Sequence, residues 1–177
     1  MRATTAFESA VEEHQGRVFT FASYLLGCRE EAEDVTQEVL LKLWRNPRTA
    51  GSNRLGGWLL KVTRNACFDR LRSRRTANRV FQATPDSRVL ELVAASGPDP
   101  ETRARAAELG GWLEKAVGKL AEPQRSIVIL REVQGLSYRE ICDALDLSMD
   151  RVKVYLHRGR RRLREELKEV RANVSAA

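Results

Sequence analysis

GLSYREICDALDLSMDRVKVYLHRGRRRLREEL, residues 135–167, predicts two helices joined by a short turn. Ser137 is a candidate N-cap with Glu140 three residues later, which is the spacing of a capping box. Ile141, Ala144 and Leu145 follow at helical spacing, and Ser148 can cap the second helix. The stretch therefore predicts a helix-turn-helix over 137–145 and 148–170, the motif that places its second helix in the major groove of DNA.

The second of these helices has an apolar and a basic side. At about 100° per residue, one arc of the helix collects the residues expected to face the core, namely Val152, Tyr155, Leu156, Gly159 and Leu163. The opposite arc collects the residues expected to face outward, namely Asp150, Arg151, Lys153, Val154, His157, Arg158, Arg161 and Arg164. Such a face, basic but chemically varied, suits the major groove.

The same helix has an unbalanced charge. Residues 151–164 contain seven Lys or Arg and no Asp or Glu. One explanation is a solvated charged surface, but such a surface usually interleaves both signs to gain pairs at i,i+4. An unrelieved run of cations calls for an external polyanion, so the pattern favours binding to DNA.

Composition limits the class of protein. The chain has 177 residues, of which 42% are hydrophobic, 6% aromatic and 31% charged, with few Gly or Pro, and this predicts an all-α protein. Its net charge of +7 and pI near 9.8 are typical of proteins with a nucleic-acid partner.

The three cysteines give information about the cellular compartment. Cys28, Cys67 and Cys142 form no CxxC pair, so we expect small core residues and neither a zinc site nor a disulfide framework. The sequence also lacks a signal segment and an apolar run of roughly 18 residues. A cytoplasmic protein without membrane insertion is therefore expected.

The chain is expected to form two helical domains. Residues 79–111 contain three of the five prolines and lose helical periodicity, so they predict a flexible linker between domains 1–78 and 112–177. No strand pattern occurs. The helices expected besides the two of the helix-turn-helix are 4–26, 29–45, 55–75, 112–120 and 123–134.

EEAEDVTQEVLLKLWR, residues 30–45, predicts a helix with an acidic outer face. Its expected core arc contains Ala32, Val35, Val39 and Leu43, extended by Leu40 and Trp44. Leu41 falls outside this arc, in a frame of three polar residues: Asp34, Gln37 and Glu38. An exposed leucine in an acidic frame is typical of a protein-binding patch, although single exposed leucines are also ordinary.

GGWLLKVTRNACFDRLRSRR, residues 56–75, predicts a basic helix that packs on more than one neighbour. Trp58 lies on one apolar side, and Phe68 lies near Lys61 and Arg64 on another. Cations beside aromatic rings bind single-stranded nucleic acid, although either aromatic alone is more often a core residue. The preceding loop, NPRTAGSNRLGG at 46–57, can present polar groups to an exposed base.

These motifs, followed by LAEPQRSIVILREVQ at 120–134 and the helix-turn-helix, resemble the extracytoplasmic-function (ECF) group of sigma-70-type sigma factors. The resemblance covers nearly the whole chain in the family's order. It implies two helical domains, sigma region 2 at 1–78 and sigma region 4 at 112–177, in a bacterial RNA polymerase initiation subunit that needs no cofactor.

The resemblance also implies roles for particular residues. In region 2, an acidic helix would bind the clamp coiled coil of the beta-prime subunit through Asp34, Gln37, Glu38 and Leu41. The loop and basic helix would recognise and open the -10 element through Asn53, Arg54, Lys61, Arg64, Asn65 and Arg72. Region 4 would dock on the beta flap and contact the -35 element of promoter DNA through Asp150, Arg151, Lys153, Val154, His157 and Arg158. An anti-sigma factor would be a further partner.

Three positions depart from the usual family pattern. Asp150-Arg151 replaces Gly-Thr, Val154 replaces a frequent Ser, and Asp146 occupies a turn position that is often Gly. We expect the fold to tolerate these changes, but the -35 base preference cannot be transferred from relatives, because Arg favours guanine while Asp accepts from cytosine.

Two other classes of protein compete with this interpretation. A helix-turn-helix regulator that binds DNA without polymerase would account for residues 112–170 only, and it would usually bind two half-sites as a dimer. An enzyme is disfavoured, because His14 and His157 have no partners at metal or triad spacing and no Gly-rich phosphate loop is present.

Overall fold

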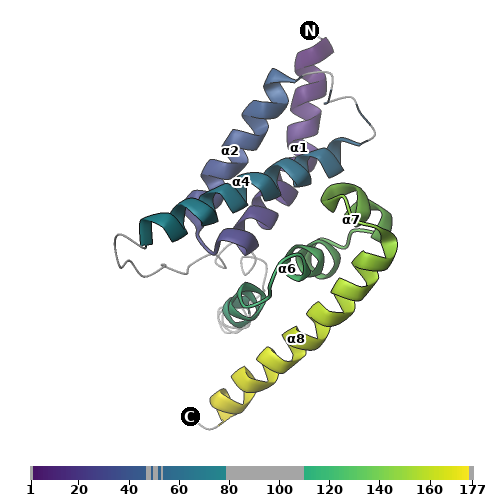
Figure 1. The fold of residues 1–177 in the computed structure, drawn as a ribbon. Coiled ribbons are helices and arrows are strands. Elements are labelled where there is room, and N and C mark those ends of the chain that lie inside the picture. Colours follow the sequence, from purple (N-terminus) through teal and green to yellow (C-terminus); the bar gives the residue numbers. More distant parts are fainter. Residues whose placement is uncertain (1, 47–48, 50–51, 53, 79–109, 176–177) are drawn as a thin grey trace, which may run out of the picture.

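The protein is all-helical over the part of the chain that the structure describes. The computed structural model describes residues 2–46, 49, 52, 54–78 and 110–175 (Figure 1), and no strand occurs among them. This confirms the all-α prediction. The predicted linker lies outside the described residues except for positions 110 and 111, which begin the described part of a helix that ends at 118.

Three long helices build the N-terminal unit: α1 (Arg2–Leu26), α2 (Arg29–Arg45) and α4 (Leu55–Asn78). Figure 1 shows α1 and α2 running side by side with α4 crossing them. Gly27 ends α1 with a φ of +62°, and its N–H donates to Ser23 O at 2.9 Å, so the chain reverses within two residues. Fully buried apolar residues from the three helices, among them Phe21, Val35 and Leu59, form the core.

α2 differs from the sequence prediction at its C-terminal end. Val35, Val39 and Leu43 are buried as expected, but Trp44 is 54% exposed and makes an edge-on contact with Phe7 of α1, with ring centroids 4.9 Å apart. The helical wheel placed Trp44 at the margin of the core arc. The ring of Phe7 packs against Trp44, but more than half of the Trp44 surface stays exposed, so the prediction that it extends the core is wrong.

The C-terminal unit contains the helix over 110–118, α6 (Gln124–Val128), the π-helical turn η2 (Ile129–Val133), α7 (Tyr138–Leu145) and α8 (Met149–Ser175). The continuous helix expected over 123–134 is thus one α-helical turn followed by a π-helical turn. Residues 127–130 are all buried, which is more than one stripe of a helix, so this segment is surrounded by the rest of the unit.

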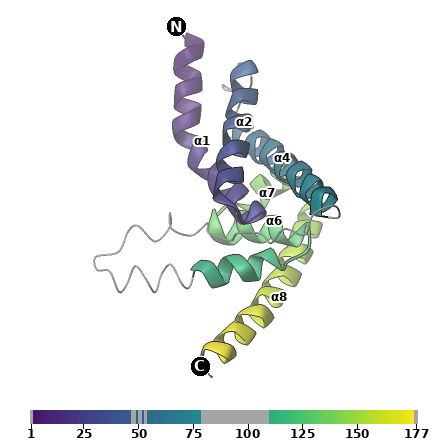
Figure 2. The ribbon, with the colours of Figure 1, turned by 90° about the vertical axis from the view of Figure 1, so that its left-hand side faces the viewer.

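The two units pack against each other, a relationship that the sequence had left open. α4 lies against α7, and residues of both units belong to one continuous cluster of buried residues. Two hydrogen bonds from the C-terminal unit to α1 add to this packing. Arg125 Nη1 donates to Leu25 O near the end of α1 at 3.2 Å, and Gln134 Nε2 donates to Arg17 O further back in α1 at 2.9 Å. Figure 2 shows α8 extending away from this junction.

Candidate nucleic-acid and protein interfaces

The turn between α7 and α8 is fixed by local hydrogen bonds. Glu140 N donates to Ser137 Oγ at 3.3 Å and Ser137 N donates to Glu140 Oε2 at 2.7 Å, which confirms the capping box. The hydrogen bonds from Ser137 lower the pKa of the Glu140 carboxyl. Asp146 ends α7 in the left-handed region at φ +58°, which Asp tolerates better than most residues, and Arg151 N donates to Ser148 Oγ at 3.4 Å. The helix-turn-helix is therefore confirmed.

α8 divides into the two faces that its periodicity predicts. Val152, Leu156 and Gly159 are buried, and Tyr155 and Leu163 are half-buried against the core. All residues expected on the outward face are exposed, namely Asp150, Arg151, Lys153, Val154, His157, Arg158, Arg161 and Arg164. The candidate -35 residues thus share one open surface on the first three turns of α8.

Part of the basic run on α8 is neutralised within the protein. Arg160 Nη2 lies 2.7 Å from Glu132 Oε1, and Arg162 Nη2 lies 2.8 Å from Glu166 Oε1. Arg161 Nε is 4.0 Å from Glu165 Oε1. The expectation of an unrelieved run is therefore wrong for these three arginines, because the acids follow at i+4 or come from η2. Over the described residues, Arg151, Lys153, Arg158 and Arg164 form no ion pair, and three of them flank Val154.

Two of the candidate -10 residues on α4 lie beside acidic groups of the C-terminal unit. Lys61 Nζ lies 3.4 Å from Asp146 Oδ2, and Arg64 Nη2 lies 3.6 Å from Glu122 Oε2. The Arg64 guanidinium also stacks over the Phe68 ring at 4.7 Å from its centroid. Both cations thus face acidic groups of the C-terminal unit.

The remaining candidate -10 residues are exposed where the structure describes them. Arg54 and Asn65 are exposed, and Arg72 Nη1 makes a surface pair with Asp69 Oδ1 at 3.2 Å. Asn53 lies outside the described residues. Trp58 is half-buried and Cys67 fully buried on α4, so this helix packs on several neighbours as predicted.

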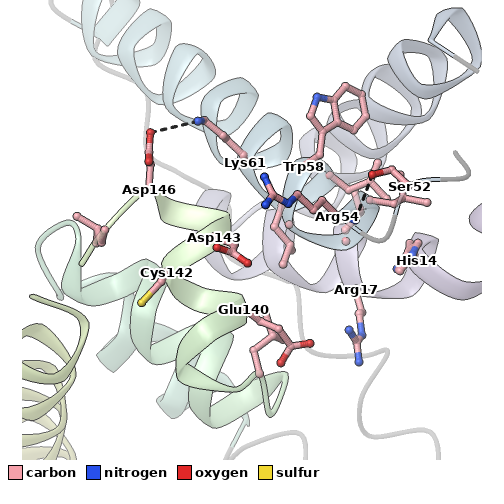
Figure 3. A pocket seen from close by; sticks show the side chains of 18 of the residues that line it. His14, Arg17, Ser52, Arg54, Trp58, Lys61, Glu140, Cys142, Asp143 and Asp146 are labelled. Carbon is pink, nitrogen blue, oxygen red and sulfur yellow. Dashed lines mark hydrogen bonds and ion pairs between the residues drawn. The ribbon is translucent and has the colours of Figure 1, made fainter. Parts of the chain in front are cut away.

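A cavity of about 1080 Å³ lies at the junction of the two units. Figure 3 shows Trp58, Arg54 and Lys61 of the N-terminal unit on one side, and Asp143 and Asp146 of α7 on the other. Its walls carry both signs of charge. The cavity exists only while the two units are packed together, since its lining comes from both.

The acidic face of α2 is open as predicted. Leu41 is 54% exposed, and Asp34, Gln37 and Glu38 are exposed around it. Arg70 Nη1 of α4 lies 3.3 Å from Asp34 Oδ2, so this ion pair orients the Asp34 carboxylate.

Trp44 adds a second exposed apolar side chain to this surface of α2. Its ring lies three residues after Leu41 and is equally exposed, so the two form neighbouring apolar groups on the helix surface. Sequence reasoning missed this residue as part of the patch. The signal that could have found it is its position at the edge of the apolar arc.

The described residues contain no group of three or more His, Cys, Asp or Glu that could hold a metal ion. Burial raises the pKa of the Cys67 thiol to about 12, so this thiol stays protonated, while Cys28 and Cys142 are only half-buried. The expectation of three core cysteines therefore holds fully for Cys67 alone. Over the described helices, no stretch has the length and apolarity needed to cross a membrane.

Comparisons with known proteins agree with this geometry. The family described as Sigma-70 region 2 matches residues 10–77, and the family described as Sigma-70, region 4 matches residues 110–163. The ECF RNA polymerase sigma factor SigL of Mycobacterium tuberculosis is 32% identical over 161 residues, which cover 90% of this chain and 87% of SigL. This chain belongs to the ECF RNA polymerase sigma factors.

Two further relatives extend the comparison of this sigma factor. The ECF RNA polymerase sigma factor SigE of Mycolicibacterium smegmatis is 32% identical over 165 residues, which cover 93% of this chain and 63% of SigE. The sigma factor RpoE of Bartonella quintana, solved in complex with the anti-sigma factor NepR, matches with a TM-score of 0.69 and 25% identity. That match covers 92% of this chain and 96% of RpoE.

Proposed function

We propose that this sigma factor directs core RNA polymerase to promoters by placing α8 in the -35 major groove. The observation that carries the proposal is the open face of α8 around Asp150, Val154 and His157. The cations beside them form no ion pair over the described residues, namely Arg151, Lys153 and Arg158. Mixed cationic, acidic and apolar chemistry on one helical face supports readout of bases as well as attraction to phosphate. We assign the -35 contacts to Asp150, Arg151, Lys153, Val154, His157 and Arg158.

We assign recognition and opening of the -10 element to the N-terminal unit. The contacts proposed are Asn53, Arg54, Lys61, Arg64, Asn65 and Arg72. The Arg64 side chain is 26% exposed and faces Glu122 in the packed arrangement, so we propose that the two units separate when Arg64 binds DNA. Lys61 is half exposed beside Asp146, and separation would free it fully. Separation also fits a protein that contacts two promoter elements with different domains, for which we propose the boundaries 1–78, 79–111 and 112–177.

The acidic face of α2 is the proposed docking surface for core polymerase. Leu41 and Trp44 supply exposed apolar groups, and Asp34, Gln37 and Glu38 surround them. Apolar and aromatic side chains inside a polar rim are the usual composition of a binding hot spot. We propose that this surface binds the clamp coiled coil of the beta-prime subunit, while the C-terminal unit docks on the beta flap.

An anti-sigma factor is the further partner that we propose. RpoE of Bartonella quintana forms a complex with the anti-sigma factor NepR, and its fold matches nearly the whole of this chain. The packed arrangement of the two units supports such regulation, because a protein that binds both units at once would keep Arg64 beside Glu122 and away from DNA.

Run-off transcription with core polymerase and a promoter library tests the proposal. We expect transcripts only when chain, core polymerase and a matching promoter are combined, and loss of transcription for the double variant Arg151→Glu, Lys153→Glu. Arg29→Glu is the control, because it reverses a charge at an exposed residue of α2 whose ion pair over the described residues is with Glu33. Sequence-specific binding as a dimer without polymerase, with no stimulation of transcription, would instead identify a helix-turn-helix regulator.

A further inference from the structure

Val154 differs in chemistry from its neighbours on the outward face of α8. It is 46% exposed, and it is the one large apolar side chain exposed on this helix over residues 149–168, where the structure describes side chains. Its neighbours one turn before and after are all exposed and polar, namely Asp150, Arg151, His157 and Arg158. The outward face therefore has an apolar centre with a charged surround.

Packing within the protein does not account for Val154. Val152 and Leu156 are 0% and 1% exposed, and Val154 is two residues from each, which places it about 200° around the helix from both. A single exposed valine on a protein surface is ordinary. Val154, however, lies at the middle of the face proposed to enter the major groove. Its contacts in the complex then depend on the chemical groups at the edges of the bases.

The major groove offers one apolar group. Adenine, guanine and cytosine present only donors and acceptors at their major-groove edges, whereas thymine adds its C5-methyl group. Valine has no donor or acceptor, and its branched Cβ leaves one strongly preferred rotamer in a helix. It therefore presents its methyl groups in a fixed direction and loses little freedom on binding.

Resting on the proposed function, we infer that Val154 selects thymine at one position of the -35 element by packing against the C5-methyl group. The flanking cations Arg151, Lys153 and Arg158 hold the helix in the groove at that register. A serine at position 154 would not select thymine in this way. Its hydroxyl group can hydrogen-bond to either base of a pair, whereas the valine methyl groups can pack only on the thymine methyl.

The test removes a single methyl group from the DNA. The holoenzyme first selects its -35 sequence from a randomised duplex library, and each thymine of the selected site is then replaced by deoxyuridine, which lacks only the C5-methyl. We expect one replacement to weaken holoenzyme binding roughly fourfold, which corresponds to the burial of about one methylene group. The other replacements should have little effect.

Two variants of Val154 complete the experiment. Val154→Ala should abolish the effect of the deoxyuridine replacement, while Val154→Ile, which keeps a branched apolar side chain, should retain it. A selected site without a thymine effect, or an equal effect in Val154→Ala, would overturn the inference and leave the proposed function intact. A library that yields no preferred -35 sequence would refute the proposed function, and this inference with it.

Discussion

Lys61 Nζ on α4 lies 3.4 Å from Asp146 Oδ2 at the end of α7, so a proposed -10 contact is paired with the turn of the -35 reader. Both side chains are more than half exposed, and Coulomb energy at such a site is small and screened by salt. The pair therefore biases the packed arrangement by about 0.2–1 kcal/mol and does not lock it.

Asp146→Asn should shift the protein toward separated units. Asparagine also tolerates the left-handed backbone of position 146, so the change removes charge without adding strain. Fluorescence transfer between labels on the two units, measured from low to high salt, should show fewer packed molecules and a weaker salt dependence. Asp150→Asn makes the same chemical change at an exposed residue of α8, away from the cavity and without an ion pair over the described residues, and is the control. Identical curves for wild type and Asp146→Asn would contradict the prediction.

Leu41→Glu should weaken binding to core polymerase without unfolding the domain. Because Leu41 is 54% exposed, the free energy of unfolding should change by only about ±0.5 kcal/mol. Affinity for core polymerase and thermal unfolding would be measured together. Val154→Glu makes the same chemical change at a similarly exposed residue of the DNA-facing surface and should leave core affinity unchanged. A large loss of stability with normal affinity would show that Leu41 is a packing residue.

The basic residues along α8 should divide into those that contact bases and those that contact phosphates. Arg151→Ala and Lys153→Ala, near the N-terminal end of the helix, should change the preferred -35 sequence, with a loss of about 1–3 kcal/mol for a bidentate contact. Arg164→Ala should weaken binding to all sequences alike and lower the log-log salt slope by about one. Arg161→Ala should do the same to a smaller extent, because Arg161 already lies beside Glu165. Holoenzyme binding to -35 variants at several salt concentrations measures both effects. A uniform loss in all four variants would place base recognition elsewhere.

Gly159→Ala should destabilise the C-terminal unit. A Cβ at this position would lie 2.7 Å from Val128 Cγ2 and 3.5 Å from Gln124 Cβ, so α8 and α6 would have to move apart. Val128 is buried and short, so it cannot turn aside, and overpacking of this kind costs about 1–3 kcal/mol. Alanine's better helix propensity, worth about 1 kcal/mol, offsets only part of this cost. Chemical denaturation would measure the loss, with Gly111→Ala, where a Cβ meets no atom within 4 Å, as the control.

Glu114 should make stability depend on pH. Its side chain is buried where the helix over 110–118 meets the end of α1, its Oε1 has no hydrogen-bond partner among the described residues, and burial raises its pKa. The folded state then binds a proton more tightly than the unfolded state, so this contribution to stability falls as pH rises from about 4.3 through the raised pKa.

Glu114→Gln should remove that part of the pH dependence. Thermal unfolding of wild type and variant at pH 5 and pH 8 would be compared, and the variant should gain stability relative to wild type at the higher pH. Glu12→Gln changes an exposed carboxyl of α1 that has no ion pair over the described residues, and it controls for the loss of one negative charge. A difference between wild type and Glu114→Gln that stays constant with pH would contradict the assignment.

Several features of this protein could be predicted from local sequence because their causes lie within one or two helical turns. The capping box of Ser137 and Glu140 and the two faces of α8 depend on residues three or four apart, and the structure confirms them. The exposure of Leu41 likewise follows from its angle on α2. Short-range spacing decides these features, whichever neighbours the helices meet.

Tertiary structure alone decided which charged and aromatic groups remain available. Arg160 is paired with Glu132 of η2, Lys61 faces Asp146, and Trp44 packs edge-on against Phe7 while more than half of its surface stays exposed. These relationships join residues 28 to 85 positions apart, or depend on how far a neighbouring helix extends. A helical wheel gives the direction of a side chain, but it contains no information about the partner that the packing of other helices brings to that side.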